Sequence, residues 1–118
     1  MLEAIHPKLP MRSKVITKAY YIDKLNFVQL GEDEFTDYLM LQKDNIQIHF
    51  FLFENINPKE NYGQVYIRVK NIEKFYDSLL IKDVTIHPNG ALEKKPWGQK
   101  EFALLDPNGN LLTFGETK

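Results

Sequence analysis

The sequence predicts an α+β fold in which two βαβββ modules form a curved, half-open mixed sheet. Each half of the chain contains a helix-like segment followed by stretches with strand periodicity. The two helix-like segments have similar amino-acid sequences, and a turn precedes the last strand of each half. One such module cannot bury its own sheet face, so two are expected to pair. We place module one at about 1–56 and module two at about 61–118, within a single domain.

Module one is expected to open with an extended segment over Ala4–Met11, whose two prolines suit an edge strand. Ser13 is expected to cap a helix running to about Leu25, and Asn26 has the residue type for a left-handed cap after it. Three strands should follow, the last two joined by a turn at 43–45: Phe27–Leu30, Phe35–Leu41 and Ile46–Phe53.

Module two repeats this order. Gly63–Val69 alternates apolar and polar residues, which predicts a strand with Gln64, Tyr66 and Arg68 on the groove or interface side. Asn71 is expected to cap a helix, because apolar residues follow it at helical spacing. The remaining expected elements are strands over Val84–His87, Glu101–Leu105 and Asn110–Phe114, with a hairpin turn at Asp106-Pro107-Asn108-Gly109.

Composition excludes several classes of function. The chain has 118 residues, of which 43% are hydrophobic and 26% charged, as in ordinary globular proteins. The chain has 15 basic and 16 acidic residues, so it has no overall positive charge that would attract nucleic acid or an anionic membrane. The absence of cysteine excludes disulfides and thiolate chemistry. Neither a leader-like N-terminus nor a membrane-spanning apolar run is present, so we expect a cytoplasmic protein.

A long stretch near the C-terminus carries the most specific motif. The segment from Lys95 to Phe114, KPWGQKEFALLDPNGNLLTF, is similar to the PWG, EFAL, DP and GN pattern of bleomycin-resistance proteins. The prolines near the N-terminus, the end of the first helix and the turn at 44–45 match in order and spacing. The whole chain therefore resembles the glyoxalase/bleomycin-resistance/dioxygenase (vicinal oxygen chelate) superfamily.

The resemblance implies a homodimer, often with an exchanged N-terminal segment, and two grooves at the subunit interface. It also implies a non-catalytic protein that sequesters a drug-like or aromatic small molecule, of which bleomycin is the best-known example. The alternative is a metal-dependent glyoxalase, lyase or thiol transferase of the same superfamily. A third possibility is an interaction module that has lost its ancestral ligand.

Trp97 matches the groove tryptophan of the resembled family, and Phe35 matches a phenylalanine after an acidic pair, here Asp33-Glu34. Gln64 and Phe51 depart from one close family type, which suggests a different or smaller ligand. The alternative for Trp97 is that it fills a corner of the sheet, and the alternative for Phe35 is that it belongs to the core. Core or interface packing is also the more frequent role for four other aromatic residues: Tyr38, Tyr62, Tyr66 and Phe114. The ligand-binding candidates are Trp97, Phe35, Gln64, Phe51, Tyr66, Gly98, His49 and Tyr38.

The superfamily's metal-ligand positions fall on His6, His49, Gln64 and Thr113, a poor set because it contains no carboxylate. Glu116 would face the other side of its strand unless the register slips. We therefore expect no metal cofactor; the alternative metal site is His6, His49, Gln64 and Glu116. No nucleophile elbow, phosphate loop or dinucleotide motif is present.

Overall fold

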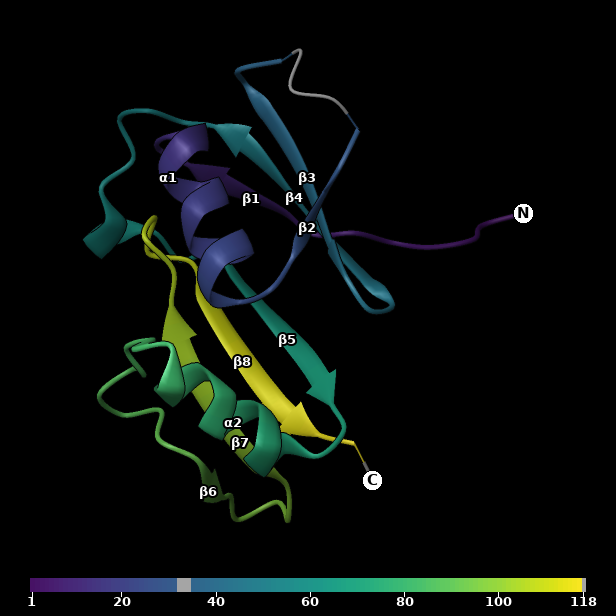
Figure 1. Cartoon of the computed structure of the whole chain (residues 1–118), viewed down its shortest axis with the longest axis vertical. Coiled ribbons are helices and arrows are strands. Elements are labelled where there is room, and N and C mark those ends of the chain that lie inside the picture. Colours follow the sequence, from purple (N-terminus) through teal and green to yellow (C-terminus); the bar gives the residue numbers. More distant parts are fainter. Residues whose placement is uncertain (32–34, 118) are drawn as a thin grey trace.

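The computed structural model describes residues 1–31 and 35–117, arranged as two stacked modules (Figure 1). Module one consists of β1 (Lys8–Met11), α1 (Lys14–Lys18), the π-helical segment η1 (Ala19–Lys24), β2 (Val28–Leu30), β3 (Tyr38–Lys43) and β4 (Ile46–Leu52). Module two consists of the 3-10 turn η2 (Pro58–Glu60), β5 (Gln64–Val69), α2 (Ile72–Ile81), β6 (Glu93–Lys94), β7 (Lys100–Leu105) and β8 (Leu111–Glu116). No helix among the described residues is long and apolar enough to cross a membrane.

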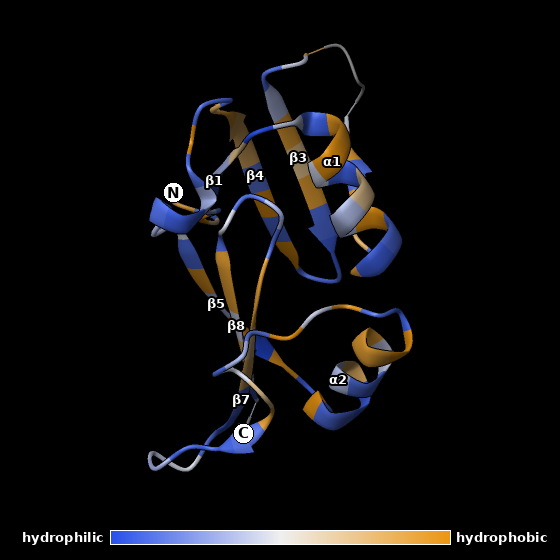
Figure 2. Cartoon of the chain, turned by 90° about the vertical axis from the view of Figure 1, so that its left-hand side faces the viewer, coloured by the Kyte–Doolittle hydropathy of each residue, from blue (hydrophilic) through white to orange (hydrophobic). Residues whose placement is uncertain are grey.

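Each module contributes one mixed sheet of four strands. Sheet A has the order β1-β4-β3-β2 and sheet B the order β5-β8-β7-β6. In both sheets the first strand runs parallel to the last strand of its module, and the other pairs are antiparallel. Figure 2 shows that α1 and α2 lie on the same side of the molecule, each against its own sheet. The predicted fold class of two βαβββ modules is confirmed.

The first helix begins as expected. The hydroxyl of Ser13 accepts a hydrogen bond from the Ile16 N–H at 3.3 Å, and Asn26 adopts the left-handed conformation with φ of 62°. The first strand is shorter than expected, because pairing with β4 starts at Lys8 rather than Ala4. Proline has no N–H for the ladder, so Pro7 contributes only its carbonyl, which accepts from the His49 N–H at 3.0 Å.

Three other expectations were wrong. Segment 84–87 is not a strand, although the His87 N–H donates to the Ala103 carbonyl; the edge strand β6 lies later, at Glu93–Lys94. Phe35 precedes β3, because the ladder to β4 ends where the Leu52 N–H reaches the Asp37 carbonyl. Asn71 occupies the N-cap position of α2, but its side chain makes no capping hydrogen bond and its φ is 54°.

The core lies between each sheet and its helix. Sheet A buries Leu39, Leu41, Ile48 and Phe50 beneath α1 and η1, and sheet B buries another apolar set beneath α2. Phe102 and Phe114 stack in sheet B with their centroids 4.9 Å apart. The buried apolar side chains of sheet B are those of Phe102, Leu104, Leu112 and Phe114.

A turn of module two, Asp106–Asn110, enters module one; we call it the inter-module turn. The buried Asp106 carboxylate accepts hydrogen bonds from the Tyr21 hydroxyl at 2.7 Å and from the Asn110 side-chain amide at 2.9 Å. Asn108 accepts from the Arg12 N–H at 2.8 Å. Burial raises the pKa of Asp106, whereas the hydrogen bonds that its carboxylate accepts from Tyr21 and Asn110 lower it. The predicted turn therefore also joins the modules.

Candidate functional site

The face of each sheet that points away from its helix, here called the outer face, carries most of the candidate residues. In sheet A, strand pairing places Tyr38 opposite Phe51 and Met40 opposite His49 on this face. In sheet B, Gln64, Tyr66 and Arg68 of β5 are exposed, while the alternate residues are half-buried against the helix side. This agrees with the expected sidedness of β5.

His49 organises the outer face of sheet A. Its Nδ1 lies 2.9 Å from the Tyr38 hydroxyl and its Nε2 lies 3.1 Å from Gln47 Oε1. The ring of His6 lies 5.3 Å from that of His49, and Lys8 Nζ sits 5.4 Å from the Tyr38 centroid. Burial, followed by the neighbouring His6 and Lys8, lowers the pKa of His49 below 6.5. These contacts make an aromatic, hydrogen-bonded surface.

These residues do not fit a metal centre within one chain. Both ring nitrogens of His49 are already hydrogen-bonded, and Gln64 belongs to the other sheet. Glu116 pairs with Val69 and so lies on the helix side of sheet B, away from the outer face. Across residues 1–31 and 35–117 no three potential metal-binding side chains gather. The four family positions offer two imidazoles, an amide and a hydroxyl, with no carboxylate to offset the charge of a divalent ion.

Glu101 organises the outer face of sheet B. Its side chain is largely buried, and its Oε2 accepts hydrogen bonds from the Tyr66 hydroxyl at 2.5 Å and from Trp97 Nε1 at 3.1 Å. The Arg68 guanidinium lies 4.9 Å from the Tyr66 centroid and also donates to Gln99. Trp97 as a residue remains 62% exposed. An exposed indole is therefore held in place by a buried carboxylate.

Two glycines shape this cluster. Gly98 follows Trp97 with φ of 89° and its N–H donates to the Lys95 carbonyl at 2.9 Å, which closes the turn that carries the indole. A Cβ on Gly115 would lie 1.9 Å from the Tyr66 hydroxyl. Gly115 thus leaves the space in which the Tyr66 side chain reaches Glu101.

The eight candidates occupy separate places in one chain. Tyr38, His49 and Phe51 lie on sheet A, whereas Gln64, Tyr66, Trp97 and Gly98 lie on or beside sheet B. Phe35 lies in the loop before β3, where its carbonyl accepts from Lys14 Nζ, and its ring is exposed. The acidic pair Asp33-Glu34 lies outside the described residues.

Sequence reasoning missed Glu101, and it placed Arg68 on the groove side of its strand without including it among the ligand-binding candidates. The alternation of β7 was a usable signal, since it places Glu101 on the face opposite the buried Phe102. Its position four residues after Trp97, as the one acidic residue of β7, also marks it. The missing information was the pairing of β7 with β8 and of β8 with β5, which brings Glu101 near Tyr66.

Comparison with known proteins identifies the family. The model of the glyoxalase/bleomycin resistance protein/dioxygenase superfamily matches residues 16–114. A bleomycin resistance protein of Geobacillus stearothermophilus is 26% identical over 128 aligned positions, covering 97% of this chain and 96% of that relative. A relative of the same description from Klebsiella pneumoniae is also 26% identical and covers 95% of this chain and 90% of its own length.

Solved structures share the fold. A bleomycin resistance determinant encoded on the transposon Tn5 superposes with a TM-score of 0.88 at 24% identity, with 99% of each chain covered. Since the family model spans most of the sequence and the architecture agrees, the chain belongs to the glyoxalase/bleomycin resistance protein/dioxygenase superfamily.

Proposed function

We propose that this chain is a non-catalytic binding protein that sequesters bleomycin or a related cationic, aromatic compound on the outer faces of its sheets. The observation that carries the proposal is the Trp97 indole, exposed over most of its surface yet hydrogen-bonded to the buried Glu101 carboxylate. The similarity to bleomycin resistance proteins over nearly the full chain supports the same ligand class.

The chemistry of the outer faces suits such a ligand. Aromatic rings offer flat surfaces for stacking and attract cations through their faces. Trp97, Tyr66 and Phe51 all expose a third or more of their surface on this side. Glu101 adds a carboxylate beside two of these rings. The metal-dependent alternative is weaker, because both nitrogens of His49 are hydrogen-bonded and Glu116 faces the other side of sheet B.

A homodimer is part of this proposal. The side chains of Met1, Leu2 and Ile5 are more than nine-tenths exposed, and the segment before β1 extends away from the body of the chain (Figure 1). Apolar side chains in such a segment favour a partner that covers them. The candidate residues also fall on two sheets, so a second copy that placed its sheet B against this sheet A would complete a groove. We propose a cytoplasmic location, which suits a cysteine-free chain.

Titration with metal-free bleomycin tests the proposal. Trp97 is the single tryptophan, so its fluorescence reports directly on the outer face of sheet B. We expect saturable quenching at one drug molecule per subunit, and loss of binding heat in Trp97→Ala. Tyr62→Ala, which removes an exposed aromatic outside the cluster, is the matched control and should bind normally. Absence of both quenching and heat would rule out bleomycin as the ligand.

Light scattering tests the dimer independently of any ligand. A mass near twice 13.9 kDa is expected, and removal of residues 1–7 should shift it toward a single subunit. A mass near 13.9 kDa for the full chain would contradict the proposed groove between subunits.

A further inference from the structure

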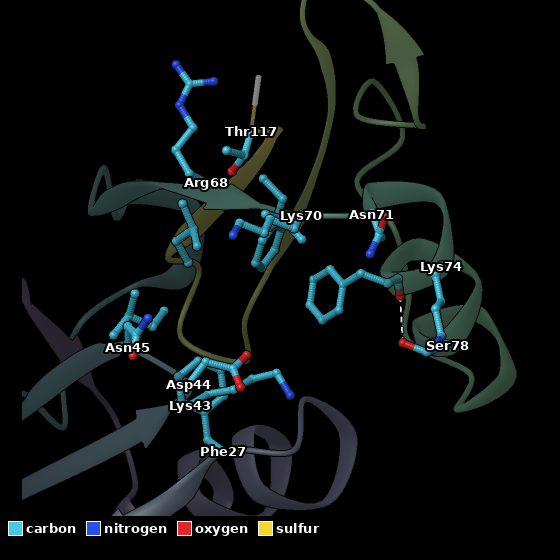
Figure 3. A pocket seen from close by; sticks show the side chains of 15 residues that line it. Phe27, Lys43, Asp44, Asn45, Arg68, Lys70, Asn71, Lys74, Ser78 and Thr117 are labelled. Carbon is cyan, nitrogen blue, oxygen red and sulfur yellow. Dashed lines mark hydrogen bonds between the residues drawn. The ribbon is translucent and has the colours of Figure 1, made fainter.

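A second cavity lies on the opposite side of sheet B from the proposed drug site. It has a volume of about 580 Å³ and separates the two modules. One wall is the β3–β4 hairpin at 43–46, and the other consists of β5, α2 and the end of β8 (Figure 3). Small-molecule pockets range from about 300 to 1,000 Å³, so this inter-module cleft has the size of a ligand site.

The floor of the inter-module cleft is apolar. Ile46, Ile67 and Phe75 pack against the core on one side and line this space on the other, which leaves them only half-buried. The more deeply buried Phe27 and Phe114 lie behind them. Beside Phe27 the modules are tied together, since Lys82 Nζ donates to the Asp23 carbonyl at 3.1 Å and to Asn26 Oδ1 at 2.5 Å. The tie holds the walls in place around an apolar space.

The rim of the inter-module cleft is basic. Lys43, Lys70 and Lys74 line it, and among the described residues none of these ammonium groups has a hydrogen-bond or ion-pair partner. Asp44 is the one acidic residue among the lining residues, so three positive charges face one negative charge in a chain of net charge −1. Arg68 points away from the cavity in Figure 3 and is held by Gln99.

The position of α2 adds to this potential. The helix begins at Ile72, next to Lys70 and Lys74, and the N-terminal end of a helix dipole favours negative charge. The lining of the cleft thus combines apolar walls with an excess of positive charge at one edge. A cationic ligand such as that proposed for the outer face does not suit this rim.

We propose that the inter-module cleft binds a small amphipathic carboxylate, with its hydrocarbon portion between Ile46, Ile67 and Phe75 and its carboxylate at Lys70 and Lys74. The two faces of sheet B then serve ligands of opposite charge. The proposal rests on the cleft alone and does not depend on bleomycin binding at Trp97.

Decanoate is the probe, and decyltrimethylammonium is the matched control with the same chain length and the opposite charge. Calorimetry of the full chain below micelle-forming concentrations should show saturable binding of decanoate and none of the cation. Methyl resonances of Ile46, Ile67 and Val69 should shift with decanoate, which locates the ligand. Equal binding of both probes, or shifts confined to other methyl groups, would overturn the proposal.

Two variants of the cleft and one control variant test the proposed contacts. Lys70→Glu combined with Lys74→Glu should weaken decanoate binding at least about tenfold, because the carboxylate then meets negative charge. Lys59→Glu combined with Lys94→Glu makes the same change in net charge away from the cleft and should leave binding unchanged. Ser78→Trp, at an exposed position of α2, should block the cleft sterically. Unaltered affinity for decanoate in both cleft variants would contradict the proposal.

Bleomycin titration of the same variants separates the two hypotheses. The cleft substitutions lie on the helix side of sheet B, so quenching of Trp97 by bleomycin should be retained. Loss of decanoate binding with retained quenching supports the inter-module cleft as a separate site. Seating of the partner's N-terminal segment in the cleft, seen as methyl shifts on removal of residues 1–7, would count against it.

Discussion

Glu101 holds two aromatic side chains through a single oxygen atom. Tyr66 and Trp97 both donate to its Oε2, so the orientation of each ring depends on the same carboxylate. Hydrogen bonds to a charged acceptor are shorter and stronger than bonds between neutral groups, so they fix the orientation of their donors more firmly. Glu101 therefore acts as a positioning residue for the proposed stacking surface, and the ring of Trp97 is the part that would touch the ligand.

Replacement of Glu101 should separate positioning from stability. In Glu101→Ala the two donors can turn to water, since both rings are substantially exposed, so the free energy of unfolding should fall only modestly. Disorder of Trp97 should weaken bleomycin binding about two- to tenfold, because ordering a side chain on binding costs about 0.5–1.5 kcal/mol. Glu101→Gln keeps one acceptor oxygen and should recover part of the affinity.

Time-resolved anisotropy of the Trp97 emission measures the ordering directly. Faster depolarisation is expected in Glu101→Ala than in Glu101→Gln or the unmodified chain. Identical anisotropy in all three proteins would show that Glu101 does not orient the indole.

His49 gives stability a pH dependence. Its pKa is lowered from 6.5 by burial and then by His6 and Lys8, so the unfolded chain binds more protons near pH 6 than the folded chain does. Stability from this residue is therefore complete above pH 6.5 and is lost as the pH falls through the lowered pKa. His49→Gln should flatten this dependence. Urea midpoints measured from about pH 7.5 to about 5.5 check it, and parallel curves would contradict it.

At the scale of elements, β8 shapes the site without contributing a functional side chain. Gly115 lies beneath Tyr66, and a Cβ there would come within 1.9 Å of the tyrosine hydroxyl. Gly115→Ala should push the exposed Tyr66 ring outward and break its hydrogen bond to Glu101. We expect weaker bleomycin binding with a small change in thermal stability, measured by calorimetry and by thermal melting. Unchanged affinity would show that Tyr66 placement is unimportant.

Local patterns predicted some elements better than others. The alternation in β5 and the helical spacing after Asn71 identified a strand and a helix, because each pattern belongs to one element. Val84 and Ile86 alternate as well, yet no strand forms there, since a strand also needs a partner edge and that depends on the rest of the sheet. The meeting of Tyr66 with Glu101 was unpredictable for the same reason.

At the scale of the molecule, the inter-module turn holds the two halves together. Asp106 is buried, so loss of a donor leaves its carboxylate poorly satisfied. Tyr21→Phe should lower the free energy of unfolding by about 1–3 kcal/mol. Tyr62→Phe, which alters an exposed hydroxyl, should change it little. Urea unfolding checks both, and equal stability of Tyr21→Phe and the unmodified chain would contradict the bridging role.

The turn chemistry of 106–109 was readable from the sequence, whereas its burial against module one was not. Asp, Asn and Gly favour turns, and turns usually lie at the surface. The buried state of Asn108 and Asn110 depends on acceptors and donors from residues almost a hundred positions away, among them Arg12 and Pro10. Such contacts require the arrangement of both modules to be known.

The parallel pairing of β5 with β8 has a consequence for biosynthesis. Residues Gln64–Val69 emerge from the ribosome well before Leu111–Glu116, their hydrogen-bonding partner. Until then both edges of β5 are unpaired, whereas the finished sheet leaves only one, and unprotected strand edges promote aggregation. The inter-module turn is translated immediately before β8. The joining of the two modules and the pairing of β5 with β8 therefore both occur late in the translation of this region. A nascent chain paused before residue 106 should therefore be a client for chaperones.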